Sequence, residues 1–91
     1  MVTTQQIDKC IAVAKRYGAT KLVLFGSAVH DAANARVIDL LCEGVEGRDF
    51  FKMGAEMEDE TMKPVDVVSM VPCTRFVQYN MTKGRVLHAT Y

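Results

Sequence analysis

The apolar residues between positions 7 and 17 recur three or four residues apart, which is the spacing of one face of a helix. Thr3 and Gln6 have the spacing of a capping box at the start of that helix. Gly18 suits the left-handed position that closes a helix. We therefore expect a first helix that covers one face of a sheet.

Four short runs of apolar and β-branched residues have the length and composition of strands. They are Leu22–Phe25, Arg36–Cys42, Pro64–Met70 and Arg85–Ala89. Side chains alternate along a strand, so Val37, Asp39 and Leu41 are expected on one face of the second run. The last run suits an edge strand.

Helical spacing returns between these runs. Asp49 can cap a helix that stops before Pro64, because the residue before a proline is pushed out of the helical region. Thr74 can cap a shorter helix that ends at Gly84. The inward-facing residues of this shorter helix are expected to be Phe76, Val77 and Met81.

Two of the predicted strands are each interrupted by one aspartate. Asp39 lies between Ile38 and Leu40, and Asp66 lies within a β-branched run. An unpaired carboxylate is costly to bury, so such a residue usually has a partner, often a metal ion. If the two strands are neighbours, both carboxylates can face one site. The alternative is that each aspartate lies at a strand end or binds a lysine.

The first strand ends abruptly at Gly26 and Ser27. Glycine permits a sharp backbone turn and a close approach by a ligand. Serine is a good helix N-cap, and the N–H groups at a helix N-terminus can bind an anion such as phosphate. This turn is therefore a candidate phosphate-binding element.

Composition predicts one domain over residues 1–91, with a hydrophobic fraction of 49% that supports a globular chain. Eleven basic residues balance eleven acidic ones, which disfavours nucleic acid as the primary ligand. The widely spaced Cys10, Cys42 and Cys73 indicate free thiols rather than a zinc site. Neither a leader sequence nor a membrane-spanning run is visible, so we expect a cytoplasmic protein without membrane partners.

The ordered segments Leu24-Phe25-Gly26-Ser27, Ile38-Asp39-Leu40-Leu41 and Val65-Asp66-Val67-Val68 resemble the minimal nucleotidyltransferases of the DNA polymerase beta superfamily, of the antitoxin-like type. That family carries a Gly-Ser turn, then an Asp-x-Asp strand, then a third aspartate on the next strand. The resemblance extends from about Ile7 to His88. It implies an α/β (α+β) fold in which helices pack on a small mixed sheet of about four strands.

The resemblance also implies an activity, the transfer of a nucleoside monophosphate from a nucleoside triphosphate such as ATP to an acceptor hydroxyl. Gly26 and Ser27 would hold the triphosphate. Asp39 and Asp66 would be the catalytic carboxylates and would bind Mg²⁺, and Asp66 would also help to activate the acceptor.

One departure from the family pattern changes this expectation. Val37 stands where the first aspartate of Asp-x-Asp belongs, and its side chain cannot bind a cation. The chain therefore resembles a degenerate copy, with Mg²⁺ binding and catalysis weakened or lost. The alternative function is a non-catalytic, antitoxin-like module that binds a helical partner of the HEPN type. Self-association is a further expectation, because a small domain with an edge strand can form a homodimer.

Overall fold

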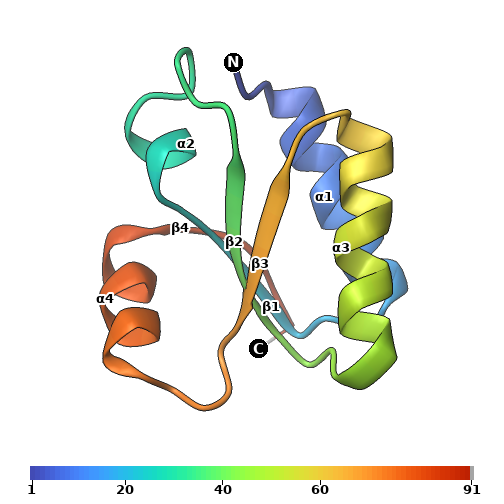
Figure 1. Cartoon of the computed structure of the whole chain (residues 1–91). Helices are drawn as coiled ribbons and strands as arrows, with labels where there is room; N and C mark the ends of the chain where they lie inside the picture. The colour runs from blue at the N-terminus through green and yellow to red at the C-terminus, as the bar shows by residue number, and fades with distance from the viewer. Residues whose placement is uncertain (91) are drawn as a thin grey trace.

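The computed structural model describes residues 1–90 (Figure 1). Its elements are α1 (Thr4–Arg16), β1 (Lys21–Phe25), α2 (Ser27–His30), β2 (Ile38–Glu43), α3 (Gly47–Thr61), β3 (Val65–Ser69), α4 (Arg75–Lys83) and β4 (Arg85–Ala89). The strands form one mixed sheet in the order β3-β2-β1-β4, in which β2 and β3 are parallel and the other neighbours are antiparallel. The predicted class, an α/β (α+β) chain with a small mixed sheet, is confirmed. Within residues 1–90 no helix has the length and apolarity to cross a membrane.

The capping predictions hold for two helices. At the start of α1 the Thr3 hydroxyl accepts from the Gln6 N–H at 3.1 Å, and the Gln6 side chain accepts from the Thr3 N–H at 2.9 Å. The Thr74 hydroxyl accepts from the Val77 N–H at 3.2 Å at the start of α4. These bonds satisfy backbone groups that a helix leaves unpaired, so local sequence fixes where each helix begins.

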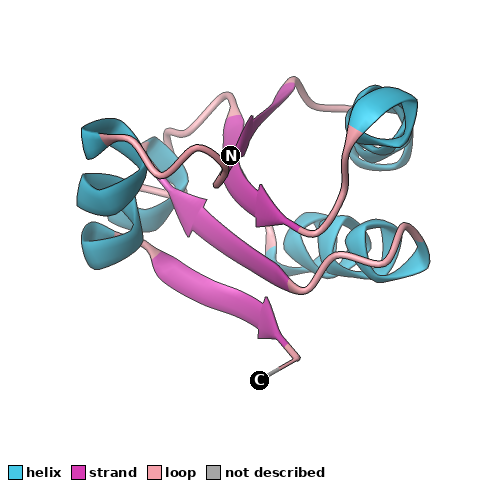
Figure 2. Cartoon of the chain, turned by 90° about the horizontal axis from the view of Figure 1, so that it is seen from below, coloured by secondary structure: helices cyan, strands magenta, loops and turns pink. Residues whose placement is uncertain are grey.

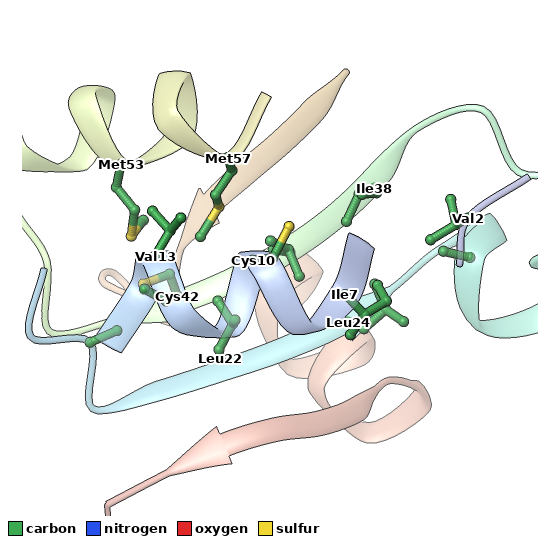
Figure 3. Packing of buried hydrophobic residues seen from close by; sticks show 14 of the residues in the cluster. Val2, Ile7, Cys10, Val13, Leu22, Leu24, Ile38, Cys42, Met53 and Met57 are labelled. Atoms are coloured by element: carbon green, nitrogen blue, oxygen red, sulfur yellow. The ribbon is translucent and has the colours of Figure 1, made fainter. Parts of the chain in front are cut away.

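The larger core lies between the sheet and two helices, α1 and α3 (Figures 2 and 3). The apolar stripe of each helix faces the alternating apolar residues of the strands. The central residues of this larger core are Ile7, Cys10, Val13, Leu22, Leu24, Ile38, Leu40, Met53 and Met57. We call this set the α1–α3 core.

A smaller core lies on the other face of the sheet, where α4 packs. Its buried members are Val23, Phe25, Leu41, Met70 and Val77, and Val68 and Met81 lie partly buried against them. We call this set the α4 core. Because α4 is short, this face is covered over a smaller area than the first (Figure 1).

The cysteines are free thiols, as predicted. Cys10 and Cys42 are buried, whereas Cys73 is exposed. Burial raises the pKa of the Cys10 thiol and of the Cys42 thiol to about 11 each. Both stay protonated near neutral pH and behave as small apolar residues of the core.

The second strand begins later than predicted, at Ile38 rather than Arg36. Strand β1 ends at Phe25, opposite Asp39, and β3 begins at Val65, opposite Ile38. Arg36 and Val37, which directly precede Ile38, consequently have no partner in a neighbouring strand. Val37 is half-buried and lies outside the strand, so the prediction that the second strand includes this position is wrong.

Three further sequence predictions need correction. The N-cap of α3 is Glu46, which has extended backbone angles, and Asp49 lies in the first turn instead. The N-cap of α2 is Gly26, so Ser27 is the first helical residue and makes no side-chain cap bond. Phe76 does not point inward, because the inward stripe of α4 is Val77 with Met81, and Phe76 is 52% exposed.

Candidate functional site

Asp39 and Asp66 lie side by side on neighbouring strands. They are Cα partners in the parallel ladder of β2 and β3. Asp39 alternates with Ile38 and Leu40, which point into the α1–α3 core, so its side chain lies on the opposite face, where α4 packs. The neighbours of Asp66 in β3 also pack against the α1–α3 core, which places Asp66 on the same face as Asp39. The predicted adjacency of the two strands is confirmed.

Gly26 brings the turn after β1 against Asp39. Its φ is +75°, a backbone conformation that residues with a Cβ rarely adopt. A Cβ at this position would lie 2.5 Å from the Asp39 Oδ2, closer than van der Waals contact allows. Glycine is therefore required at position 26 for two reasons: the backbone has a positive φ, and there is no room for a Cβ. The Asp39 carboxylate rests against the backbone of the Gly26 turn.

The carboxylates at this site lack a basic partner in the part of the chain that the structure describes. Partial burial raises the pKa of the Asp39 carboxyl above its usual value, and the nearby Asp66 carboxylate raises it further. Among residues 1–90, neither aspartate forms an ion pair with a lysine, arginine or histidine. A bound cation would remove the repulsion between the two carboxylates, so the arrangement favours a cation or a ligand that carries one.

The two aspartates are less buried than expected. Asp39 is half-buried and Asp66 is exposed on the edge strand β3, so the expectation of two buried charges is wrong. Each is the second residue of its strand, as the strand-end alternative required. The lysine partner of that alternative is not found among residues 1–90. Water reaches both carboxylates, which lowers the cost of keeping them charged.

These carboxylates can supply ligands to one hard cation. Mg²⁺ prefers oxygen ligands, and proteins commonly hold it through one or two carboxylates together with substrate phosphates. Within residues 1–90 no group of three or more His, Cys, Asp or Glu side chains could hold a metal ion. Asp39 and Asp66 thus fit a single Mg²⁺ shared with the phosphates of a ligand, and they are too few for a two-metal clamp.

Two adjoining grooves lie along α3 and the edge strand β3, and the first of them includes Asp66. One, of about 290 Å³, is lined mainly by apolar residues of these two elements, including Phe50, Phe51 and Ala55, with Asp66 at the edge. The other, of about 260 Å³, shares Phe50 and Phe51 and extends to Val71. Phe51 is 77% exposed. We call this surface the α3–β3 groove.

The sequence analysis did not identify the α3–β3 groove. A signal was present, because Phe51, Gly54 and Ala55 are spaced three and four residues apart and form a second apolar stripe on α3. The first stripe, with Met53 and Met57, fills the α1–α3 core. The second stripe is not needed to fill the α1–α3 core, and it lines the α3–β3 groove instead.

The chain has the nucleotidyltransferase fold. It is similar to a chain in the crystal structure of a mutant of the toxin–antitoxin pair MntA–HpeT, with a TM-score of 0.76 and 17% sequence identity. The similarity covers 92% of this chain and 73% of that chain. No protein-family model and no curated protein matches the sequence. At this level of identity the likeness establishes the fold alone.

Proposed function

We propose that this chain is a nucleotidyltransferase-like domain that binds a nucleoside triphosphate with Mg²⁺ and whose transfer activity is weakened or lost. The observation that carries the proposal is the register of Asp39 and Asp66 on adjacent strands, with Asp39 against the Gly26 turn. In this proposal both aspartates hold Mg²⁺, and Gly26 and Ser27 line the triphosphate. The bound ion would neutralise charge on the phosphates.

The reaction would form a bond between an acceptor hydroxyl oxygen and the α-phosphorus, and it would release pyrophosphate. The exposed carboxylate of Asp66 is open to an acceptor that arrives from solvent and can take up the hydroxyl proton. Val37 supplies no third carboxylate, so charge that develops on the leaving pyrophosphate has one fewer stabilising ion. This shortage is the reason for expecting slow or absent transfer.

Calorimetric titration with each nucleoside triphosphate, with and without Mg²⁺, tests the proposal. We expect Mg²⁺-dependent binding that Asp39→Asn and Asp66→Asn each weaken. Asp59→Asn is the matched control, because Asp59 is an exposed carboxylate on α3 outside the candidate site. Binding that is absent in the parent, or unchanged in both site variants, would refute the assignment.

A second function, that of an antitoxin-like module that binds a protein partner, is supported by the α3–β3 groove. Phe51, which lines the groove, is 77% exposed, and the other lining residues are mostly apolar. An apolar groove of this kind suits an amphipathic helix, the recognition mode expected for a HEPN-type partner. This role does not require catalysis, and the groove shares Asp66 with the proposed nucleotide site.

Two variants separate these functions. Ala55→Arg introduces a long charged side chain into the groove, and we expect it to abolish capture of a helical partner while leaving nucleotide binding intact. Asp39→Asn should have the opposite effect. Self-association stays a prediction, for which sedimentation of the parent chain over a range of concentrations is the measurement.

A further inference from the structure

The face that carries the two aspartates continues into aromatic side chains. Asp66 pairs with Asp39 across β3 and β2, and Asp39 pairs with Phe25 across β2 and β1. Residues opposite each other in a sheet project on the same face with neighbouring side chains. The Phe25 ring in turn meets the Phe76 ring of α4 edge to face, with centroids 5.7 Å apart and an interplanar angle of 87°. A row of four side chains therefore runs from two carboxylates to two rings.

Phe76 is the open end of this row. Phe25 is 7% exposed and belongs to the α4 core, whereas Phe76 is 52% exposed. The helix that carries Phe76 lies close against β1. At its end, Gly84 is so near this strand that a Cβ there would lie 2.6 Å from the Leu24 carbonyl oxygen. The ring is thus anchored on one side by Phe25 and presents aromatic surface to solvent on the other.

The surroundings of Phe76 are basic. From Val67 to the last residue, the sequence contains Arg75, Lys83 and Arg85 but no aspartate or glutamate. All three basic side chains are exposed, on α4 and at the start of β4. At helical spacing, Lys83 lies on the same side of α4 as Phe76, because the two are seven residues apart, and Arg75 directly precedes Phe76 at the start of the helix. Their charge favours an anionic ligand on this face and so complements the cation expected at the aspartates.

We propose that Phe76 forms a base-stacking subsite, so that a nucleobase lies on its exposed ring while the phosphates reach the cation at Asp39 and Asp66. This inference rests on the proposed nucleotide-binding function. One strand spacing separates Asp39 from Phe25, and the two rings add 5.7 Å, so the row from Asp39 to Phe76 spans roughly 10 Å. That length suits a nucleotide extended between its phosphates and its base. Every base has a π-face, so this subsite should accept all four bases with little discrimination.

The test compares two ligands, ATP and inorganic tripolyphosphate, each with Mg²⁺. Tripolyphosphate lacks a base, so only ATP can use the subsite. Phe76→Ala should weaken ATP binding about 10-fold, within the range that base–aromatic stacking provides, and leave tripolyphosphate binding unchanged. Tyr79→Ala is the matched control, because Tyr79 is 63% exposed on the same helix.

Two further variants protect the test against loss of folding. Phe76→Leu keeps an apolar side chain over Phe25 but removes the stacking surface, so it should behave as Phe76→Ala does. Phe76→Trp should retain ATP binding, and its indole fluorescence should be quenched by ATP but not by tripolyphosphate.

The outcomes distinguish this inference from the function on which it rests. If the parent binds both ligands and Phe76→Ala and Phe76→Leu bind ATP as the parent does, the stacking subsite is refuted and nucleotide binding stands. Equal weakening of ATP and tripolyphosphate would also refute it, because Phe76 would then act on the phosphate site. If the parent binds neither ligand, both proposals fail.

Discussion

The two faces of the sheet differ in how completely helices cover them. The α1–α3 face is covered by two helices of 13 and 15 residues, and Leu40 and Met57 on this side are fully buried. The α4 face is covered by one helix of 9 residues, and Asp39 and Asp66 lie side by side on this face near the starts of β2 and β3. The first face supplies most of the apolar burial, and the second leaves charged and aromatic groups open to solvent.

This difference shows on which face the fold can hold charged groups that have no basic partner. An unneutralised pair of carboxylates would be costly in the centre of the α1–α3 core, where the side chains are fully buried. On the α4 face the same pair stays solvated at the edge of a smaller core. Most of the apolar burial and the proposed nucleotide site thus lie on opposite faces of one sheet.

The largest effect should come from breaking the covered face. Leu40→Ala removes a fully buried side chain between the helices and the sheet, and we expect it to lower the free energy of unfolding by about 2–5 kcal/mol. Val77→Ala in the α4 core deletes fewer carbon atoms from a smaller cluster and should cost less. Urea denaturation of both variants measures the difference. Equal losses would show that the two cores contribute alike.

Gly26→Ala should cause the next largest loss in the free energy of unfolding, because it strains the turn after β1 where this turn meets Asp39. The positive φ alone costs roughly 1–3 kcal/mol for a residue with a Cβ. The new Cβ would also collide with the Asp39 carboxylate. Thermal or urea unfolding measures the total loss.

A double-mutant cycle separates these two causes. Asp39→Ala removes the carboxylate that the new Cβ would meet, so Gly26→Ala should cost less in that background than in the parent. The remaining cost is the backbone strain. If the cost is the same in both backgrounds, the carboxylate does not rest against the turn.

Much of the fold follows from the sequence because its causes are local. The capping box at Thr3 and the alternation along the strands are visible in the letters and correctly place α1 and the sheet faces. The start of β2 at Ile38 was not predictable in this way, because it depends on where β1 and β3 end. Such a boundary is decided by partners that are distant in the sequence.

In the candidate site, too, some features follow from local sequence and others depend on residues that are distant in the sequence. The pair Asp39 and Asp66 was found from the sequence because a lone carboxylate in an apolar strand is unusual. Their half-buried and exposed positions depend on the edge placement of β3, which no local pattern reveals. Phe76 was assigned to the core for a similar reason, since the direction of the inward stripe of α4 is set by its packing on β1.

Val37→Asp tests the open face by adding a third carboxylate two residues before Asp39. In the absence of metal we expect a loss of about 1 kcal/mol, because a half-buried apolar group is replaced by a charged one. With Mg²⁺ the affinity for a nucleoside triphosphate should rise. Calorimetry with and without Mg²⁺ measures this gain, and Val37→Asn is the control of similar size without charge. A folded Val37→Asp variant that binds no better than the parent would favour the partner-binding function.

The smallest effect is expected for Asp39→Asn, which removes one charge from the open face without changing its shape. The raised pKa of Asp39 means that the folded state holds a proton on this carboxyl more tightly than the unfolded state, whose ordinary value is 3.8. Above the raised pKa the ionised carboxylate therefore disfavours folding, and this penalty disappears as the pH falls through that pKa to below 3.8. Asparagine carries no such penalty, so without metal the variant should match or slightly exceed the parent in stability near neutral pH, and the difference should vanish in acid. Chelator-treated samples unfolded across this pH range measure the effect, and added Mg²⁺ should stabilise the parent alone. A loss of several kcal/mol in the variant would instead reveal a structural hydrogen bond or ion pair at Asp39.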